Sequence, residues 1–171
     1  AGTIHQYRHC AFGNATFPHT LYFSSADDHE DFREPGASGT GFRMNCDSSV
    51  GDRLYASAHY QGILHFWKYP RGIFYLDDQD PLPANWTPRV KSQGVGCAPS
   101  PYAVCAMDDD VLFMAADGQF HLLSAVDTLG GTRTSSISRA LGLNQWIRDN
   151  VNLAQLSRVI SVWHPNKKVA M

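Results

Sequence analysis

The stretch Val111-Leu112-Phe113-Met114-Ala115-Ala116-Asp117-Gly118-Gln119-Phe120-His121-Leu122-Leu123 decides the expected fold class. It consists of two apolar runs rich in strand-forming residues. Between them stands Asp117-Gly118, a dipeptide that accepts the positive φ angles of a tight hairpin turn. The stretch therefore predicts a β-hairpin.

A similar pattern occurs earlier in the chain. Residues 53–66 also contain an apolar run with an Ala-rich end, a glycine, and then apolar residues alternating with polar ones. Ala58 and Ala115 are 57 positions apart, and the length of 171 residues is three times 57. Residues 1–7 fit the strand after the glycine, and residues 168–171 fit the strand before it. The spacing predicts one domain of three repeats (1–57, 58–114 and 115–171) whose first and last strands are neighbours.

A repeat of this length, with about four strand candidates, cannot bury its own apolar face, so the repeats must pack on one another. The composition of 43% hydrophobic residues, 14 Gly and 9 Pro suits a turn-rich all-β protein with one sizeable core. A β-trefoil is favoured because it fits the length and strand count without further chains. The alternatives are a three-sheeted β-prism and a propeller. Three blades do not normally close a ring, so a propeller would be completed by homo-oligomerisation.

Several local patterns refine this expectation. Residues 3–9, 119–126 and 157–163 are predicted as strands, residues 138–150 as a short helix, and residues 77–101 as a long Pro-punctuated loop. The helix is predicted because apolar residues recur at helical spacing, whereas the strands alternate or form short apolar runs.

The charge and hydropathy patterns exclude several classes of partner. A net charge of −2 argues against binding to nucleic acid, which favours a basic excess. No apolar run approaches the roughly 18 residues of a membrane-spanning helix, so we expect no membrane insertion. No signal peptide stands at the start, so a secreted protein would be represented in its mature form.

The cysteines and sequons indicate secretion. Four cysteines without a CxxC pair favour disulfides over a zinc site, and a short loop rich in proline predicts Cys97–Cys105, leaving Cys10–Cys46. Four reduced buried thiols are the alternative. Asn14-Ala15-Thr16 and Asn85-Trp86-Thr87 are acceptor sites for N-glycosylation, so Asn14 and Asn85 are expected to carry glycans. The sequence thus predicts an extracellular glycoprotein.

Short pieces of the chain resemble the fungal fucose-type propeller lectins. They are Gly39-Thr40-Gly41-Phe42, Arg53-Leu54-Tyr55, Gly62-Ile63-Leu64-His65 and Ser100-Pro101-Tyr102-Ala103-Val104. The acidic residue that such lectins place in the strand after the glycine is absent, and His5, His65 and His121 stand at those positions. No binding residue is carried over from that family.

Three segments share the order polar residue, aromatic residue, arginine. A sugar ring offers one apolar C–H face and a rim of hydroxyls, so a flat aromatic side chain beside hydrogen-bonding groups suits it. Three equivalent weak sites would gain by avidity. The alternative is that the aromatic side chains plug the core. We call these segments the first, second and third aromatic sets: Asp31, Phe32 and Arg33; Asn85, Trp86 and Arg89; Gln145, Trp146 and Arg148.

Enzymatic signals are weaker. His59, His65, Lys68 and Arg71 are close in sequence, as acid–base groups of a ribonuclease would be, but Lys68 points to the opposite strand face from His65. Tyr7-Arg8 fits the layout of ADP-ribosyltransferase toxins, which need a later glutamate, yet no Glu follows Glu34.

Metal and cofactor signals are also weak. Asp27-Asp28-His29-Glu30-Asp31 and Asp108-Asp109-Asp110 lack the spacing of a calcium loop and are read as solvated turns. Walker and dinucleotide-binding loops are absent, as is the Gly-x-Ser-x-Gly nucleophile pattern. We therefore predict neither metal nor cofactor.

The leading functional hypothesis is a secreted, non-enzymatic lectin that binds a glycan or glycoprotein through repeated sites. The alternative is a secreted trefoil-type protease inhibitor that presents the Pro-rich segment Asp80-Pro81-Leu82-Pro83-Ala84 to a protease. A secreted effector or toxin-like enzyme ranks third.

Overall fold

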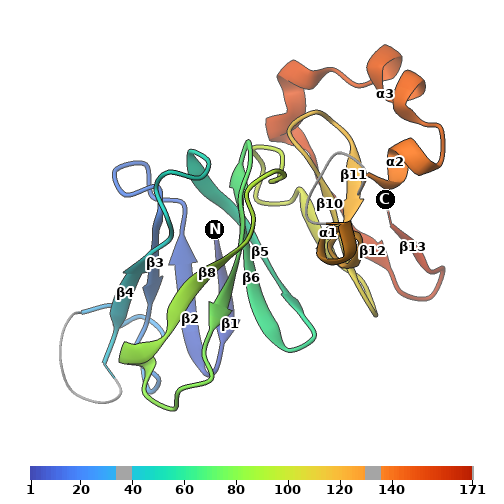
Figure 1. The fold of residues 1–171 in the computed structure, drawn as a ribbon. Helices are drawn as coiled ribbons and strands as arrows, with labels where there is room; N and C mark the ends of the chain where they lie inside the picture. Colours follow the sequence, from blue (N-terminus) through green and yellow to red (C-terminus); the bar gives the residue numbers. More distant parts are fainter. Residues whose placement is uncertain (34–39, 130–135, 171) are drawn as a thin grey trace.

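The computed structural model describes residues 1–33, 40–129 and 136–170. Antiparallel sheet dominates, and the helices are few and short (Figure 1). The mainly-β class expected from the sequence is therefore confirmed. No helix among the described residues is long and apolar enough to span a membrane.

The first sheet is formed by strands that follow one another along the chain. Its order is β1-β2-β3-β4, and each strand pairs antiparallel with the next. The strands are β1 (Gly2–His5), β2 (Arg8–Phe12), β3 (Thr20–Phe23) and β4 (Phe42–Asn45).

The second sheet has the same up-and-down order, β5-β6-β7-β8. Its longest pairing joins β5 to β6 through the turn Gln61-Gly62. A short 3₁₀ helix, η1 (Pro83–Asn85), precedes the last strand. The strands are β5 (Arg53–Tyr60), β6 (Ile63–Tyr69), β7 (Ile73–Asp77) and β8 (Thr87–Ser92).

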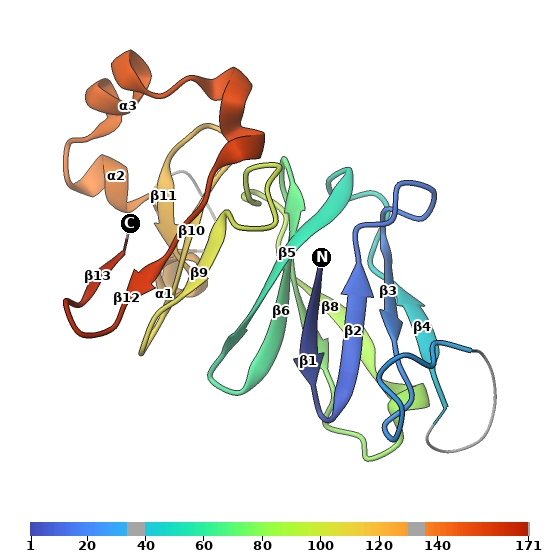
Figure 2. The same ribbon diagram turned by 180° about the vertical axis from the view of Figure 1, so that it is seen from behind.

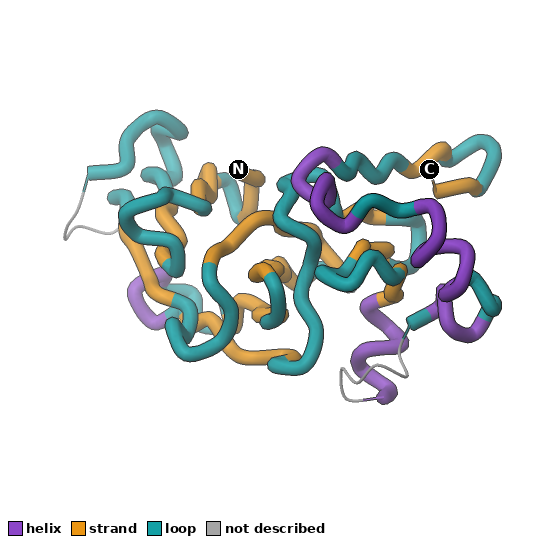
Figure 3. Tube along the Cα trace, turned by 90° about the horizontal axis from the view of Figure 1, so that it is seen from above, coloured by secondary structure: helices purple, strands orange, loops and turns teal. Residues whose placement is uncertain are grey.

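The third sheet has the order β11-β10-β9 and is followed by helices. A two-stranded ribbon of β12 and β13 completes the described chain, and Figure 3 shows α1 to α3 gathered on the side of the third sheet. The strands are β9 (Val104–Ala106), β10 (Val111–Met114), β11 (Phe120–Leu122), β12 (Trp163–His164) and β13 (Val169–Ala170). The helices are α1 (Leu123–Leu129), α2 (Ile137–Ala140), α3 (Asn144–Asn150) and the 3₁₀ helix η3 (Leu153–Arg158).

The second sheet lies between the other two and contributes to two hydrophobic cores (Figures 1 and 2). Leu64 and Phe66 face the first sheet, where they meet Phe12 and Phe23. Trp67 faces the third sheet. This alternation follows from the two-residue period of a strand. The first strand of each sheet lies beside the next, since β1 contacts β5 and β5 contacts β9.

The structure confirms the opening prediction and corrects several others. Residues 111–122 form the β10–β11 hairpin, and Gly118 has a φ of 78° in its turn. Residues 3–9 are not one strand, because the turn Gln6-Tyr7 divides them into β1 and β2. The predicted strand 119–126 gives way to α1 from Leu123 onward.

Other differences concern the C-terminal third and the long loop. The helix predicted over residues 138–150 is two helices, α2 and α3, separated at Gly142, which has a φ of 70°. Most of the strand predicted over residues 157–163 is irregular, and Leu153–Arg158 is a 3₁₀ helix. The loop predicted over residues 77–101 contains β8.

The predicted repeats do not coincide with the sheets. The boundary between residues 57 and 58 falls inside β5, and the boundary between 114 and 115 divides the β10–β11 hairpin. The first and last strands are not neighbours, because β1 pairs with β2 and β13 pairs with β12. Neither the trefoil nor any closed barrel is confirmed among the described strands.

Candidate functional site

Two strained hairpin turns lie at the same end of the first two sheets. In the β1–β2 turn, Gln6 and Tyr7 have φ angles of 44° and 62°, and in the β5–β6 turn Gln61 has a φ of 50° before Gly62. Two-residue turns of this kind favour Asn and Gly, and a side chain in the left-handed region costs about 1–2 kcal/mol per residue. Tyr7 is 83% exposed, so its packing does not offset that cost. Backbone strain retained without packing points to function.

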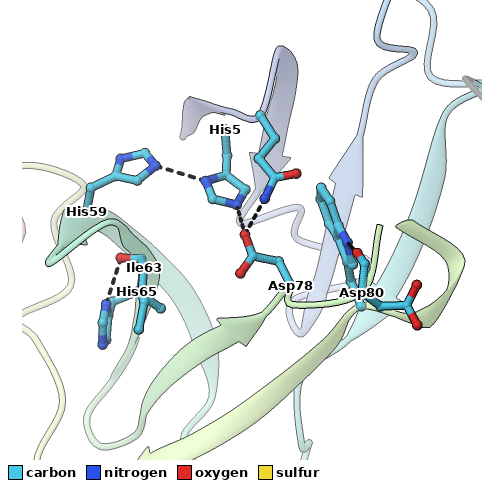
Figure 4. A network of polar contacts seen from close by, with 8 residues as sticks. His5, His59, Ile63, His65, Asp78 and Asp80 are labelled. Atoms are coloured by element: carbon cyan, nitrogen blue, oxygen red, sulfur yellow. Dashed lines mark hydrogen bonds and ion pairs between the residues drawn. The ribbon is translucent and has the colours of Figure 1, made fainter. Parts of the chain in front are cut away.

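A chain of hydrogen bonds connects these turns (Figure 4). His5 Nε2 lies 2.8 Å from Asp78 Oδ2, and Gln6 Nε2 donates to the same oxygen at 2.6 Å. On its other side, His5 Nδ1 lies 3.0 Å from His59 Nε2. His5 ends β1, His59 lies near the end of β5, and Asp78 directly follows β7. Packing of the first sheet on the second therefore assembles the chain of contacts.

One end of this chain is buried and the other reaches solvent. His5 is 5% exposed and the Asp78 side chain 11%, whereas His59 is exposed. The His5 ring stacks on His59 with centroids 5.3 Å apart and meets the edge of Trp86 at 5.8 Å. Buried His5 and partly buried Asp78 thus support an accessible imidazole.

The hydrogen-bond pattern assigns the tautomers. A carboxylate only accepts, so His5 Nε2 carries a proton, and in the neutral ring His5 Nδ1 accepts. His59 Nε2 must then donate to it, which leaves a lone pair on His59 Nδ1. Among the described residues no hydrogen-bond partner contacts that Nδ1, so the lone pair is available to a ligand.

The surroundings keep His59 neutral at physiological pH. Partial burial lowers the pKa of His59, the neighbouring His5 lowers it further, and Asp78 acts in the opposite direction. A neutral imidazole with a free lone pair is a hydrogen-bond acceptor, a base or a nucleophile. No Ser, Thr or Cys side chain in the described ranges is hydrogen-bonded to His59.

Sequence reasoning missed this site as a unit. It considered His59 only with His65, Lys68 and Arg71, and it noted His5 only as a replacement for an acidic residue. His5 and His59 are 54 positions apart and Asp78 is 73 positions from His5, so no local spacing joins them. The available signal was positional, because His5 directly precedes one two-residue hairpin turn and His59 lies just before another.

The first aromatic set lies on an exposed loop. Arg33 Nε donates to Asp31 Oδ1 at 2.8 Å and Arg33 Nη2 to Asp31 Oδ2 at 2.9 Å, and this pairing lowers the pKa of Asp31 to about 2. Phe32 meets the His9 ring edge-on at 5.8 Å. An open hollow of about 560 Å³ adjoins all three residues. The charged groups of Asp31 and Arg33 are thus hydrogen-bonded to each other.

The second aromatic set does not offer an aromatic face. Trp86 is 4% exposed and packs edge-on against Phe23 and Phe42 at 5.9 and 5.6 Å. Its Nε1 donates to the backbone oxygen of Asp80. A sugar has no access to this ring, so the expected stacking role of Trp86 is corrected to a core role. Its partners Asn85 and Arg89 are exposed and bond to the side chains of Asp80 and Asp77, respectively.

The third aromatic set lies on α3, and its aromatic residue is exposed. Trp146 on α3 is 60% exposed. Beside it, Gln145 Nε2 donates to both oxygens of Asp149 at 2.8 and 2.9 Å, and Arg148 Nη2 donates to Gln145 Oε1 at 2.8 Å. The first set is therefore on a loop, the second has its aromatic residue in the core, and the third is on a helix, so the three sets differ in structure.

The four cysteines are free thiols, so the predicted bonds Cys97–Cys105 and Cys10–Cys46 are not formed. All four lie in the interior, between 0% and 7% exposed. Burial raises the pKa of each thiol, to about 12 for Cys46. The thiols therefore behave as apolar core groups.

The remaining site predictions concern glycans and metals. Asn14 and Asn85 are both exposed. Among the described residues, no group of three His, Cys, Asp or Glu side chains is arranged to hold a metal ion.

No protein-family model matches the chain, and a search of curated proteins found no similar sequence.

Proposed function

We propose that the protein is a secreted carbohydrate-binding protein whose ligand stacks on Trp146. The observation that carries this proposal is the 60% exposure of Trp146 on α3, where Gln145 is hydrogen-bonded to both Arg148 and Asp149. A ligand that covered this indole would remove apolar surface from water, which is favourable.

The chemistry of this helix face suits a sugar. The indole offers a flat apolar surface for the C–H face of a pyranose ring, and the carboxylate of Asp149, three residues further along α3 and therefore on the same side of the helix, suits the hydroxyl rim. Because the polar side chains already hold one another in place, binding would cost little side-chain entropy.

Of the three architectures considered from the sequence, the β-trefoil, the β-prism and the propeller, we propose the propeller. Support comes from the similar order of the three sheets and from their first strands, which begin at Gly2, Arg53 and Val104. Face-to-face packing with β1, β5 and β9 side by side also resembles successive blades. Three blades would require a second copy to complete a ring. Light scattering that gives the mass of a monomer would contradict this closure.

A glycan array followed by titration of the best ligand tests the proposed activity. Trp146→Ala should weaken binding about tenfold or more, because loss of a stacking contact costs about 1.4 kcal/mol or more. The melting temperature of the Trp146→Ala variant should hardly change. Tyr102→Ala is the matched control, since Tyr102 is similarly exposed at 61% but lies before β9. Equal binding by wild type and Trp146→Ala would contradict the assignment.

A protease inhibitor is the second candidate because the Pro-rich segment is held rigidly. Asp80 Oδ1 accepts from the Leu82 amide at 2.8 Å, and Asp80 Oδ2 accepts from Asn85 Nδ2 at 2.9 Å. Leu82 is 56% exposed at the tip, as the contact residue of an inhibitory loop would be. Nanomolar inhibition of a Ser or Cys protease that is lost in Leu82→Ala, with no glycan bound, would favour this function over carbohydrate binding.

A further inference from the structure

The Asp78, His5 and His59 side chains have the connectivity of a nucleophile activated by a base that a third group orients. The contacts are 2.8 Å between Asp78 Oδ2 and His5 Nε2 and 3.0 Å between His5 Nδ1 and His59 Nε2. Both lie in the range of 2.6–3.2 Å that such triads use. The outermost member, His59, is exposed, whereas His5 is buried and the Asp78 side chain is 11% exposed. We propose that His59 is a nucleophile that accepts an acyl group from a neutral ester, with His5 as its base and Asp78 as the orienting carboxylate.

The reaction begins with the lone pair of His59 Nδ1. Nδ1 attacks the ester carbonyl carbon, a C–N bond forms, and the C–O bond to the alcohol breaks. The proton on His59 Nε2 passes along the existing hydrogen bond to His5 Nδ1, so that His5 becomes an imidazolium ion paired with Asp78. The departing alkoxide takes up this proton through water and leaves as the alcohol.

Water completes the cycle. It adds to the acyl carbon, the C–N bond to Nδ1 breaks, and the carboxylic acid is released while His59 regains its Nε2 proton. The net change is one ester and one water converted to one acid and one alcohol. No metal, oxidant or further co-reactant takes part.

The charges around His59 favour a neutral acyl donor over a phosphoryl donor. The charged or titratable groups that act on His59 are His5 on β1 and Asp78 after β7. Asp78 would repel a phosphate dianion, and no Lys or Arg among the described residues is hydrogen-bonded to the His59 ring. A neutral ester does not experience this repulsion.

The strained β1–β2 turn supplies an independent argument. Gln6, at a φ of 44°, donates to the same Asp78 oxygen that accepts from His5, so the turn fixes the carboxylate. An Asn-Gly turn would relieve the strain but would place a shorter side chain at position 6. The strain is explained if orientation of Asp78 is required.

Two neutral acyl donors test the proposal on the intact chain. With p-nitrophenyl acetate, p-nitrophenolate release by the wild type is expected to exceed release by His59→Ala and by Asp78→Asn at least tenfold. The rate should rise with pH as the His59 imidazole loses its proton. His29→Ala is the control, because His29 is exposed on the acidic loop and lies outside the triad. It should react like the wild type.

Diethyl pyrocarbonate then identifies which histidine is acylated, because the carbethoxy group that it transfers to the side chain survives peptide mapping. His59 should be modified at least tenfold faster than His29, and Asp78→Asn should remove the difference. Equal modification of both histidines, or p-nitrophenolate release unchanged in His59→Ala, would overturn the proposal. Circular dichroism of each variant establishes that a lost reaction does not reflect unfolding. Failure of the carbohydrate proposal would leave this result unaffected, because Trp146 is not involved.

Discussion

Lys68 is a charged side chain that is completely enclosed in the protein interior. It has no exposed surface, its Nζ donates to the Asp47 carbonyl oxygen, and it lies 4.9 Å from the centroid of the Phe74 ring. Burial lowers the pKa of Lys68 from the ordinary value of 10.5, with smaller opposite contributions from Cys46 and Asp47. The folded protein therefore holds this proton less tightly than the unfolded chain does.

This difference predicts a pH-dependent stability. As pH rises through the folded pKa toward 10.5, the unfolded state binds more protons, so folding becomes more favourable. Wild type should gain on the order of 1 kcal/mol relative to Lys68→Met between about pH 7 and about pH 10. Urea unfolding of both proteins measures this. Lys167→Met, at an exposed position, should show no such trend. A constant difference between wild type and Lys68→Met would contradict the buried-charge argument.

At the scale of elements, the hairpin turns differ in how well their sequences suit them. Asp117-Gly118 is a favourable turn sequence, and it was predicted correctly. Gln6-Tyr7 is unfavourable, and sequence reasoning read a continuous strand through it. Turn preferences locate relaxed turns and overlook strained ones. The long-range hydrogen bond from Gln6 to Asp78, which holds the Gln6-Tyr7 turn, is not visible in turn preferences.

Tyr7→Gly should therefore stabilise the protein. Glycine removes the steric cost of a φ of 62°, and little packing is lost because Tyr7 is 83% exposed. We expect a gain of about 1 kcal/mol, seen as a higher urea midpoint. Tyr102→Gly should instead destabilise, because Tyr102 has no positive φ and glycine only adds freedom to the unfolded chain. A lower midpoint for Tyr7→Gly would show that the turn is not strained.

The candidate sites illustrate the same limit. Trp146 was predicted as an exposed aromatic with polar neighbours, and its placement agrees because those partners lie within a few residues on α3. Trp86 has a similar local pattern but lies in the core. The His5–His59–Asp78 cluster depends on packing of two sheets, which no local spacing encodes. Composition and alternation were sufficient for the mainly-β class but not for the order of the sheets.

At the scale of the whole molecule, the second sheet contributes side chains to both hydrophobic cores. Phe66 and Trp67 are adjacent in β6 and have no exposed surface, yet one packs toward the first sheet and the other toward the third. Neither outer sheet has a core without this strand. We therefore expect the described sheets to unfold together.

Phe66→Ala and Trp67→Ala test this coupling. Each should cost about 3–5 kcal/mol, and each should shift one common transition. Calorimetry together with far-ultraviolet circular dichroism measures the transitions. Val90→Ala, at a 40% exposed position in β8, should change stability by less than about 0.5 kcal/mol. Two separate transitions in either core variant would show that the sheets are independent.

The enclosure of β6 also determines how its backbone exchanges hydrogen with solvent. This strand is bonded to β5 and β7 on its two edges, and residues 64–68 are buried on both faces. Local opening cannot expose those amides without separating both cores. In deuterated buffer these amides should be the slowest to exchange. The free energy of opening calculated from their exchange rates should equal the free energy of global unfolding. Hydrogen exchange at the centre of β6 therefore measures the stability of the whole protein.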